Sequence, residues 1–305
     1  MTAHLSYIEA VVVGAFQGVT ELFPVSSLGH AVLVPALVGG QWAQDLNVST
    51  PGSPYLAFIV GLHVATAAAL LVFFWRDWLR ILAGFISSLR YRRIETPAER
   101  LAWLIVVATI PVGLAGVALE HLFRTTLGRP IPAAGFLVLN GIALYAGEVL
   151  RRRVSPSAER DQPTPVEELH TGEAVDDRIA QLSMRRGALI GSSQILALLP
   201  GISRSGIAMV AGLWRGLSHE DAARFSFLLA TPIILAAGVY KIPDLLGPGG
   251  TGIRGQVLAG SVASFVCAYL AVRYLTRYFQ TRTLTPFAIY CAAAGAASLV
   301  WLTLR

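Results

Sequence analysis

Long apolar stretches separated by short polar segments dominate this chain of 305 residues. A helix needs about 20 mostly apolar residues to cross the hydrocarbon core of a membrane. Six stretches meet that requirement: 55–75, 101–119, 133–150, 223–243, 255–275 and 284–304. The pattern therefore predicts an all-α, polytopic membrane protein with six transmembrane helices.

Two further apolar regions, 6–39 and 187–217, are interrupted near their centres by Pro, Gly and Ser. The interruption reads FPVSSLGH in the first region and LLPGISRSG in the second. Irregular backbone is tolerated at membrane depth only where it is buried in protein or lines a wet cavity. We therefore predict that each region forms a re-entrant helical hairpin.

The two interruptions follow the same order of residue types. A Gln precedes a Pro, and a Ser follows three residues after it: Gln17, Pro24 and Ser27, then Gln194, Pro200 and Ser203. Three spans follow each hairpin, and an odd number of crossings inverts the second half of the chain. We predict one integral-membrane domain built from inverted repeats, 1–150 and 187–305, joined by 151–186. Interrupted helices at matching positions of such repeats point to a binding site near the membrane midplane.

Charge supports this topology and argues against a soluble enzyme. Only 14% of residues are charged, and the mean hydropathy is +0.61, whereas soluble domains contain about 25% charged residues. The segments 76–100 and 151–186, both interpreted as loops, contain six and seven arginines. The positive-inside rule places both in the cytoplasm and the termini outside. The net charge of +6 therefore reflects topology, and we predict no nucleic-acid partner.

Ionisable side chains at membrane depth are costly, so each one is a candidate functional residue. In the first hairpin, Gln17 and Glu21 are four residues apart and share a helical face. Ser27 and His30 are three apart and would also share a face if a helix begins there. A serine beside a histidine is a plausible nucleophile and acid–base pair. His63 lies alone in an apolar span and is interpreted as structural.

The second hairpin adds features suited to an anion. Ser203 can cap a helix whose first turn contains Arg204 and Ser205. Helix N-termini carry unpaired N–H groups and favour negative charge, and the arginine fork matches phosphate oxygens. Glu21 could orient a nucleophile or hold a divalent cation. The combination predicts a phosphate site with hydrolytic groups, and a lipid phosphate as substrate.

Two segments are similar to motifs of a known family. QGVTELFPVSSLGH, residues 17–30, and LLPGISRSG, residues 198–206, resemble the signatures of the bacterial undecaprenyl-diphosphatase, or bacitracin-resistance, family. The resemblance implies hydrolysis of undecaprenyl diphosphate to undecaprenyl phosphate and inorganic phosphate, which recycles the lipid carrier for cell-wall synthesis and confers bacitracin resistance. It also implies a multi-pass protein of the bacterial cytoplasmic (inner) membrane, with an active site accessible from the periplasmic, outer face.

The resemblance also assigns roles by motif position. Ser27 and His30 would be catalytic together with Glu21, and it stays open whether Ser or His attacks phosphorus. The expected phosphate-binding residues are Arg204, Ser203, Ser26, Gln17 and Ser205. The family implies a divalent cation, Mg or Ca, near Glu21, with Gln17 as an additional ligand, and no organic cofactor.

Several alternatives remain open at this point. A transporter that flips a polyprenyl phosphate would use the same phosphate site without hydrolysis, because inverted repeats with broken helices recur in such carriers. Leu28 and Ala208 stand where the family commonly has hydroxyl residues, which could slow turnover. The expected partners are the polyprenyl diphosphate and membrane lipids, and a homodimer is left open.

Overall fold

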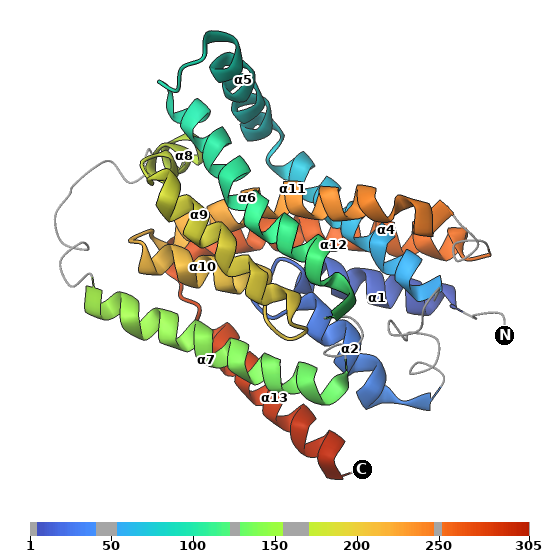
Figure 1. The fold of residues 1–305 in the computed structure, drawn as a ribbon. Coiled ribbons are helices and arrows are strands. Elements are labelled where there is room, and N and C mark those ends of the chain that lie inside the picture. The colour runs from blue at the N-terminus through green and yellow to red at the C-terminus, as the bar shows by residue number, and fades with distance from the viewer. Residues whose placement is uncertain (1–4, 41–53, 123–128, 155–170, 247–251, 305) are drawn as a thin grey trace.

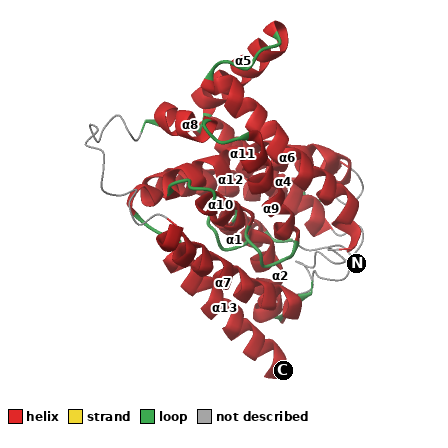
Figure 2. Ribbon diagram, turned by 60° about the vertical axis from the view of Figure 1, so that its left-hand side comes forward, coloured by secondary structure: helices red, strands yellow, loops and turns green. Residues whose placement is uncertain are grey.

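The computed structural model describes the chain except residues 1–4, 41–53, 123–128, 155–170, 247–251 and 305. The described residues form helices joined by loops, without any strand (Figures 1 and 2). The elements are α1 Tyr7–Thr20, α2 Ser27–Val38, α4 Pro54–Phe73, α5 Trp75–Tyr91, α6 Pro97–Leu122, α7 Pro130–Val154, α8 Gly172–Ala180, α9 Met184–Ser193, η2 Gln194–Leu198, α10 Arg204–Trp214, α11 His219–Leu246, α12 Arg254–Thr281 and α13 Thr285–Leu304. The predicted all-α class is confirmed.

The predicted spans correspond to long apolar helices. Within the described residues, five helices are long and apolar enough to cross a membrane, namely α6, α7, α11, α12 and α13. Residues 58–73 of α4 pass the same test together with α5, from which a bend of 85° separates them. Counting that bent pair as one span gives the sixth crossing that the sequence predicts.

The outward faces of these helices are apolar. Leu114 and Val117 on α6, Ile142 on α7 and Leu258 on α12 are more than half exposed in the protein alone. A protein in water rarely exposes contiguous apolar surface of this extent. These side chains therefore face the lipid, as expected of a multi-pass membrane protein.

The segment 76–100 is not the simple loop that the charge pattern suggested, because α5 occupies most of it. Leu79, Leu82 and Ile86 form an exposed apolar stripe on this helix. On another face, Gly84 packs closely against the backbone of Ala98 at the start of α6. The apolar residues of α5 recur at helical spacing, which favours a helix in spite of its arginines. A helix with one apolar and one charged face is suited to lie at the membrane surface.

The segment 151–186 also contains helical structure, so the prediction of a polar loop is wrong for α8. Asp176 on α8 is buried and accepts hydrogen bonds from Arg224 Nε at 2.6 Å and Nη2 at 3.1 Å. It also pairs with Arg80 of α5. These ion pairs hold α8 against α5 and α11. Residues 155–170 of this segment lie outside the described part of the chain.

The two interrupted regions form hairpins at the centre of the molecule, α1 with α2 and α9 through η2 with α10 (Figure 1). Their packing partners are exchanged between the halves of the chain: α1 packs along α12, and α9 packs along α6. The spans α4 and α11 contact each other, as do α7 and α13. This reciprocity is the arrangement that two related halves produce, and it brings the two hairpin tips together.

Candidate active site

The break in the first hairpin is built by Pro24 and Ser26. Proline cannot continue a helix, and α1 ends at Thr20, four residues before it. Ser26 then caps α2, with Oγ accepting the backbone N–H of Gly29 at 3.1 Å. Its φ of 71° lies in a region that L-residues rarely adopt. This conformation places Ser27 in the first turn of α2, at the tip of the hairpin.

The second hairpin has a matching cap. Ser203 Oγ accepts the backbone N–H of Gly206 at 3.2 Å, at the start of α10. Ser203 also contacts Ser205, with 3.1 Å between their Oγ atoms, and Ser205 Oγ donates to the Phe23 carbonyl at 3.2 Å. The predicted capping role of Ser203 is confirmed. Its hydroxyl, like that of Ser205, holds the hairpins together.

The two tips meet backbone to backbone. Gly201 donates its N–H to Ser26 Oγ at 3.2 Å. A Cβ on Gly29 would lie 2.8 Å from Gly201 Cα, so a side chain there would force the tips apart. Gly201 itself has a φ of +114°, which favours glycine. The glycines in the two motifs therefore permit close approach of the hairpins.

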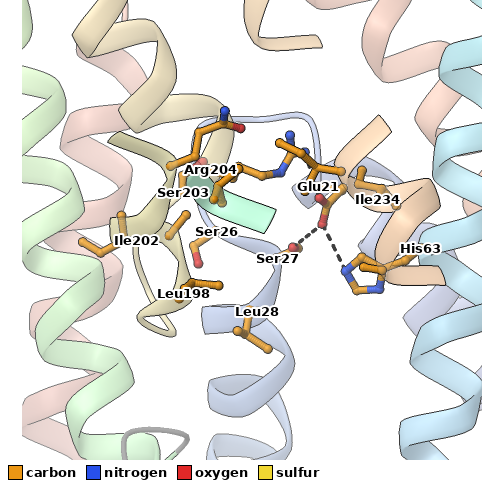
Figure 3. Close-up of a pocket in the computed structure, with 15 residues that line it drawn as sticks. Glu21, Ser26, Ser27, Leu28, His63, Leu198, Ile202, Ser203, Arg204 and Ile234 are labelled. Carbon is orange, nitrogen blue, oxygen red and sulfur yellow. Dashed lines mark hydrogen bonds and ion pairs between the residues drawn. The ribbon is translucent and has the colours of Figure 1, made fainter. Parts of the chain in front are cut away.

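A cavity of about 190 Å³ lies beside this junction (Figure 3). Its polar groups come from both hairpins and from α4, and the rest of the wall is apolar. Its lining residues are Glu21, Ser26, Ser27, Leu28, His63, Val112, Gln194, Ala197, Leu198, Ile202, Ser203, Arg204, Ile233, Ile234 and Ala237.

Glu21 accepts hydrogen bonds from three polar side chains at the cavity. Ser27 Oγ donates to Glu21 Oε2 at 2.5 Å, and Gln17 Nε2 donates to the same oxygen at 3.0 Å. The other oxygen, Oε1, accepts from Arg204 Nη2 at 3.0 Å. Glu21 is buried, and a buried carboxylate requires such partners to offset the loss of hydration. The structure thus brings Glu21, Ser27 and Arg204 together, as the sequence predicted.

Arg204 retains one unused donor. Its Nη1 is buried and has no hydrogen-bond partner among the described residues. A buried N–H group of a charged side chain without an acceptor is costly. Because Arg204 lines the cavity, an anion there could accept from Nη1 while Nη2 stays on Glu21. This geometry suits a phosphate oxygen.

His63 enters the site from α4, contrary to its interpretation as a structural histidine. Its Nε2 lies 3.2 Å from Gln17 Nε2 and 3.5 Å from Glu21 Oε2. Its side chain lines the cavity and is 30% exposed. Sequence reasoning missed it because α4 contributes to neither motif. A histidine at membrane depth was the available signal.

His30 lies elsewhere than predicted. Its Nδ1 is 2.8 Å from the Ser26 carbonyl oxygen, and its Nε2 is 2.8 Å from the Tyr290 hydroxyl. The ring is buried, packs edge-on against Phe16 and does not line the cavity. The expected pairing of His30 with Ser27 is therefore not present, because the ring nitrogens contact the Ser26 carbonyl and the Tyr290 hydroxyl instead.

The remaining candidate residues divide between the cavity wall and its support. Gln17 and Ser205 are buried beside the cavity and do not line it. Gln194, the repeat counterpart of Gln17, does line it, and its buried Oε1 has no hydrogen-bond partner among the described residues. Leu28 lies in the wall, whereas Ala208 is buried away from it.

The residues present do not fit a divalent cation held by the protein alone. No group of three or more His, Cys, Asp or Glu side chains suited to a metal occurs in the described part of the chain. Glu21 is the cavity's carboxylate, and its Oε1 already pairs with Arg204. Mg and Ca need six or more oxygen ligands, of which this site supplies few.

The chain is similar to known proteins along nearly its whole length. The family model described as bacitracin resistance protein BacA matches residues 10–297. The chain is 83% identical to the undecaprenyl-diphosphatase of Mycolicibacterium paratuberculosis (strain ATCC BAA-968 / K-10), over 100% of both chains. It is 53% identical to undecaprenyl-diphosphatase 2 of Frankia alni, over 96% of both. It is also 45% identical to the undecaprenyl-diphosphatase of Acidiphilium cryptum, over 95% of this chain and 96% of that one.

Proposed function

Because the chain belongs to the bacitracin resistance protein BacA family, we propose that it hydrolyses undecaprenyl diphosphate to undecaprenyl phosphate and inorganic phosphate. The substrate is the one that the names of its relatives indicate. The observation that carries the proposal is the convergence of Ser27, Glu21 and Arg204 in one cavity. That set combines a hydroxyl, a proton acceptor and a phosphate-binding cation.

The residues suggest how the reaction proceeds. Arg204 Nη1 binds an oxygen of the terminal phosphate, in line with its lack of another acceptor. Ser27 Oγ attacks the terminal phosphorus and passes its proton to Glu21 Oε2, 2.5 Å away. The phosphoanhydride bond breaks and undecaprenyl phosphate leaves. The proton on Glu21 goes to the leaving undecaprenyl phosphate. Water then hydrolyses the phosphoserine, with Glu21 taking a proton from the water and passing it to Ser27 Oγ, which releases inorganic phosphate and restores both residues.

The apolar wall supports a lipid substrate. Leu28, Val112, Leu198, Ile202 and Ile234 line the cavity together with the polar groups. An isoprenoid chain gains free energy on leaving water for such surroundings, about 0.8 kcal/mol per buried CH₂. A lipid diphosphate therefore matches both the polar groups and the apolar wall of the cavity.

We also place this site toward the periplasmic face of the cytoplasmic membrane, and we infer that the activity confers bacitracin resistance. The arginine-rich segments 76–100 and 151–186 support a cytoplasmic position for the opposite side. The transporter alternative is less well supported. A carrier needs Arg204 and the apolar wall, but it has no need of a serine hydroxyl hydrogen-bonded to a buried carboxylate.

The test is phosphate release from undecaprenyl diphosphate by detergent-purified protein, with Mg, with Ca and with chelator. The Arg204→Ala variant is measured beside the wild type. Loss of charge-assisted hydrogen bonds worth roughly 1.5–3 kcal/mol each should weaken phosphate binding at least tenfold. Release that depends on Arg204 would support a phosphatase. Substrate binding without release by folded wild-type protein would favour a carrier instead.

If phosphate release requires Mg or Ca, we expect the cation to bind together with the diphosphate substrate. Since the described residues offer a cation few ligands, any Mg or Ca requirement should track the diphosphate concentration. Titration of the metal at several substrate concentrations would reveal this. A tight, substrate-independent metal affinity would contradict it.

A further inference from the structure

We propose that His63 is a positioning residue of the active site, which fixes Gln17 and, through it, the Glu21 carboxylate that accepts the Ser27 proton. This inference rests on the proposed function. It concerns a residue of α4, outside both sequence motifs. Hydrogen bonds connect His63 to Gln17 and Gln17 to Glu21, and the donor and acceptor of each bond can be assigned from the atoms involved.

The position of the hydrogen on the His63 imidazole follows from the partners of its ring nitrogens. His63 Nδ1 lies 2.9 Å from the backbone carbonyl oxygen of Ile59, one turn earlier in α4. A carbonyl oxygen can only accept, so Nδ1 carries the hydrogen. In the neutral ring, Nε2 is then an acceptor. This is the nitrogen that faces Gln17, at 3.2 Å.

The acceptor at His63 Nε2 in turn sets the orientation of the Gln17 amide. An acceptor at His63 Nε2 requires the NH₂ end of the amide to face it, and that group has two hydrogens. The second hydrogen is donated to Glu21 Oε2 at 3.0 Å. Without His63, the amide would keep one acceptor instead of two, so a rotation that moves Gln17 Nε2 away from the carboxylate would cost less. His63 therefore holds a donor on Glu21.

Glu21 connects this arrangement to Ser27. Glu21 Oε1 is held by Arg204, so the orientation of Oε2 depends on Gln17 and on the Ser27 hydroxyl itself. His63 has no hydrogen bond to Ser27 among the described residues, and Glu21 lies between them. Its effect on the reaction must therefore pass through Glu21. The route by way of Gln17 has the shorter contact, 3.2 Å against 3.5 Å for the direct approach of Nε2 to Glu21 Oε2.

The test compares two substitutions at one position. His63→Leu removes the acceptor and retains an apolar side chain. Misplacement of a reacting group by about 1 Å can cost about a hundredfold in rate, so we expect kcat to fall by about that factor with little change in KM. His63→Gln places an amide oxygen about where Nε2 lies, and it should recover most of the lost rate.

A double-variant cycle tests the route. If His63 acts through Gln17, the double variant Gln17→Leu, His63→Leu should be no slower than the slower single variant. Losses that multiply would overturn the proposed route. A His63→Gln variant as slow as His63→Leu would also overturn the proposal, because it would show that a hydrogen-bond acceptor at this position does not restore the rate. Thermal unfolding in detergent confirms that each variant is folded.

A second readout separates this inference from the proposed substrate. A fluorophosphonate probe reacts at Ser27 when Oγ forms a bond to phosphorus, fluoride leaves and the proton passes to Glu21. We expect His63→Leu to slow this labelling and His63→Gln to restore it. If wild-type protein releases no phosphate but shows this pattern, the proposed function fails and the role of His63 stands. Labelling that is absent from Ser27, or independent of His63, overturns the inference.

Discussion

Asn140 Oδ1 accepts the backbone N–H of Ser203 at 3.0 Å, although 63 residues separate them. The Nδ2 group of the same side chain donates to the Pro24 carbonyl at 3.1 Å. Asn140 is buried in α7, so one amide bridges the breaks of both hairpins. Both bonds satisfy backbone groups that the interrupted helices leave unpaired. The amide thereby fixes the position of the second cap relative to the first hairpin.

Asn140→Leu should therefore destabilise the junction. The substitution leaves the buried Ser203 N–H without its acceptor and the Pro24 carbonyl with the Cys291 thiol as a weak donor, and an unpaired buried group costs about 1–3 kcal/mol. We expect a lower Tm in detergent and a reduced rate of phosphate release. Ser298→Ala is the matched control, because Ser298 is also buried in a span but bonds only to the carbonyl of Ala294 in its own helix. Equal losses of Tm in the two variants would contradict the bridging role.

The sequence predicts the hairpins and much of the polar cluster because their signals are local. Glu21 and Ser27 lie within one motif, and Arg204 follows the matching break in the second half. The repeated order of residue types indicates that the two breaks belong together. Residue type and spacing within the two motifs are therefore enough to predict that these residues share a site.

Other features could not be predicted because they depend on tertiary contacts. His63 reaches Gln17 across 46 residues, and a lone histidine in a span does not reveal its partner. Asn140 likewise resembles any isolated polar residue in a helix. The position of His30 was mispredicted because its partner, Tyr290, is 260 residues away. The charge pattern predicts loops for the segments that contain α5 and α8, because their many charged residues obscure the helical spacing of their apolar residues.

Neighbouring serines should respond differently to substitution. Ser27→Ala removes the hydroxyl that donates to Glu21 and leaves the helix cap intact. Under the proposed reaction, phosphate release should fall by about three orders of magnitude, as when a nucleophile is lost. The loss of Tm should be smaller than in Ser26→Ala, because Glu21 keeps Gln17 and Arg204 as donors. Ser26→Ala removes the cap and the bond from Gly201, and loss of a cap costs about 0.5–2 kcal/mol.

The measurements are unfolding temperature and phosphate release for both variants. Ser26→Ala should lose stability, and Ser27→Ala should lose turnover. If Ser27→Ala retained the wild-type rate, Ser27 would not be the nucleophile. The attacking group would then have to be sought among the other side chains that line the cavity.

The two positions that lack the family's hydroxyl residues should also differ from each other. Leu28 lines the cavity, so Leu28→Thr would place a hydroxyl beside the phosphate site, where a hydrogen bond contributes about 0.5–1.5 kcal/mol. We expect faster phosphate release. Ala208 is 1% exposed, and Ala208→Thr adds atoms to a packed core, at a typical cost of 1–3 kcal/mol. Faster release from Ala208→Thr without loss of Tm would show that this reasoning is wrong.

His30 provides the sharpest contrast between the family resemblance and the geometry. The ring holds the Ser26 carbonyl through Nδ1 and the Tyr290 hydroxyl through Nε2. His30→Ala removes both of these bonds and the packing of the buried ring against Phe16, although the Ser26 carbonyl keeps the backbone N–H of residue 30. We therefore expect both Tm and phosphate release to fall. His30→Asn places an amide near the position of Nδ1 and can keep the bond to Ser26. We therefore expect His30→Asn to retain more turnover than His30→Ala. A stable His30→Asn variant that releases no phosphate would instead show that His30 transfers a proton, as the resemblance implies, after a rearrangement that frees Nε2 from Tyr290.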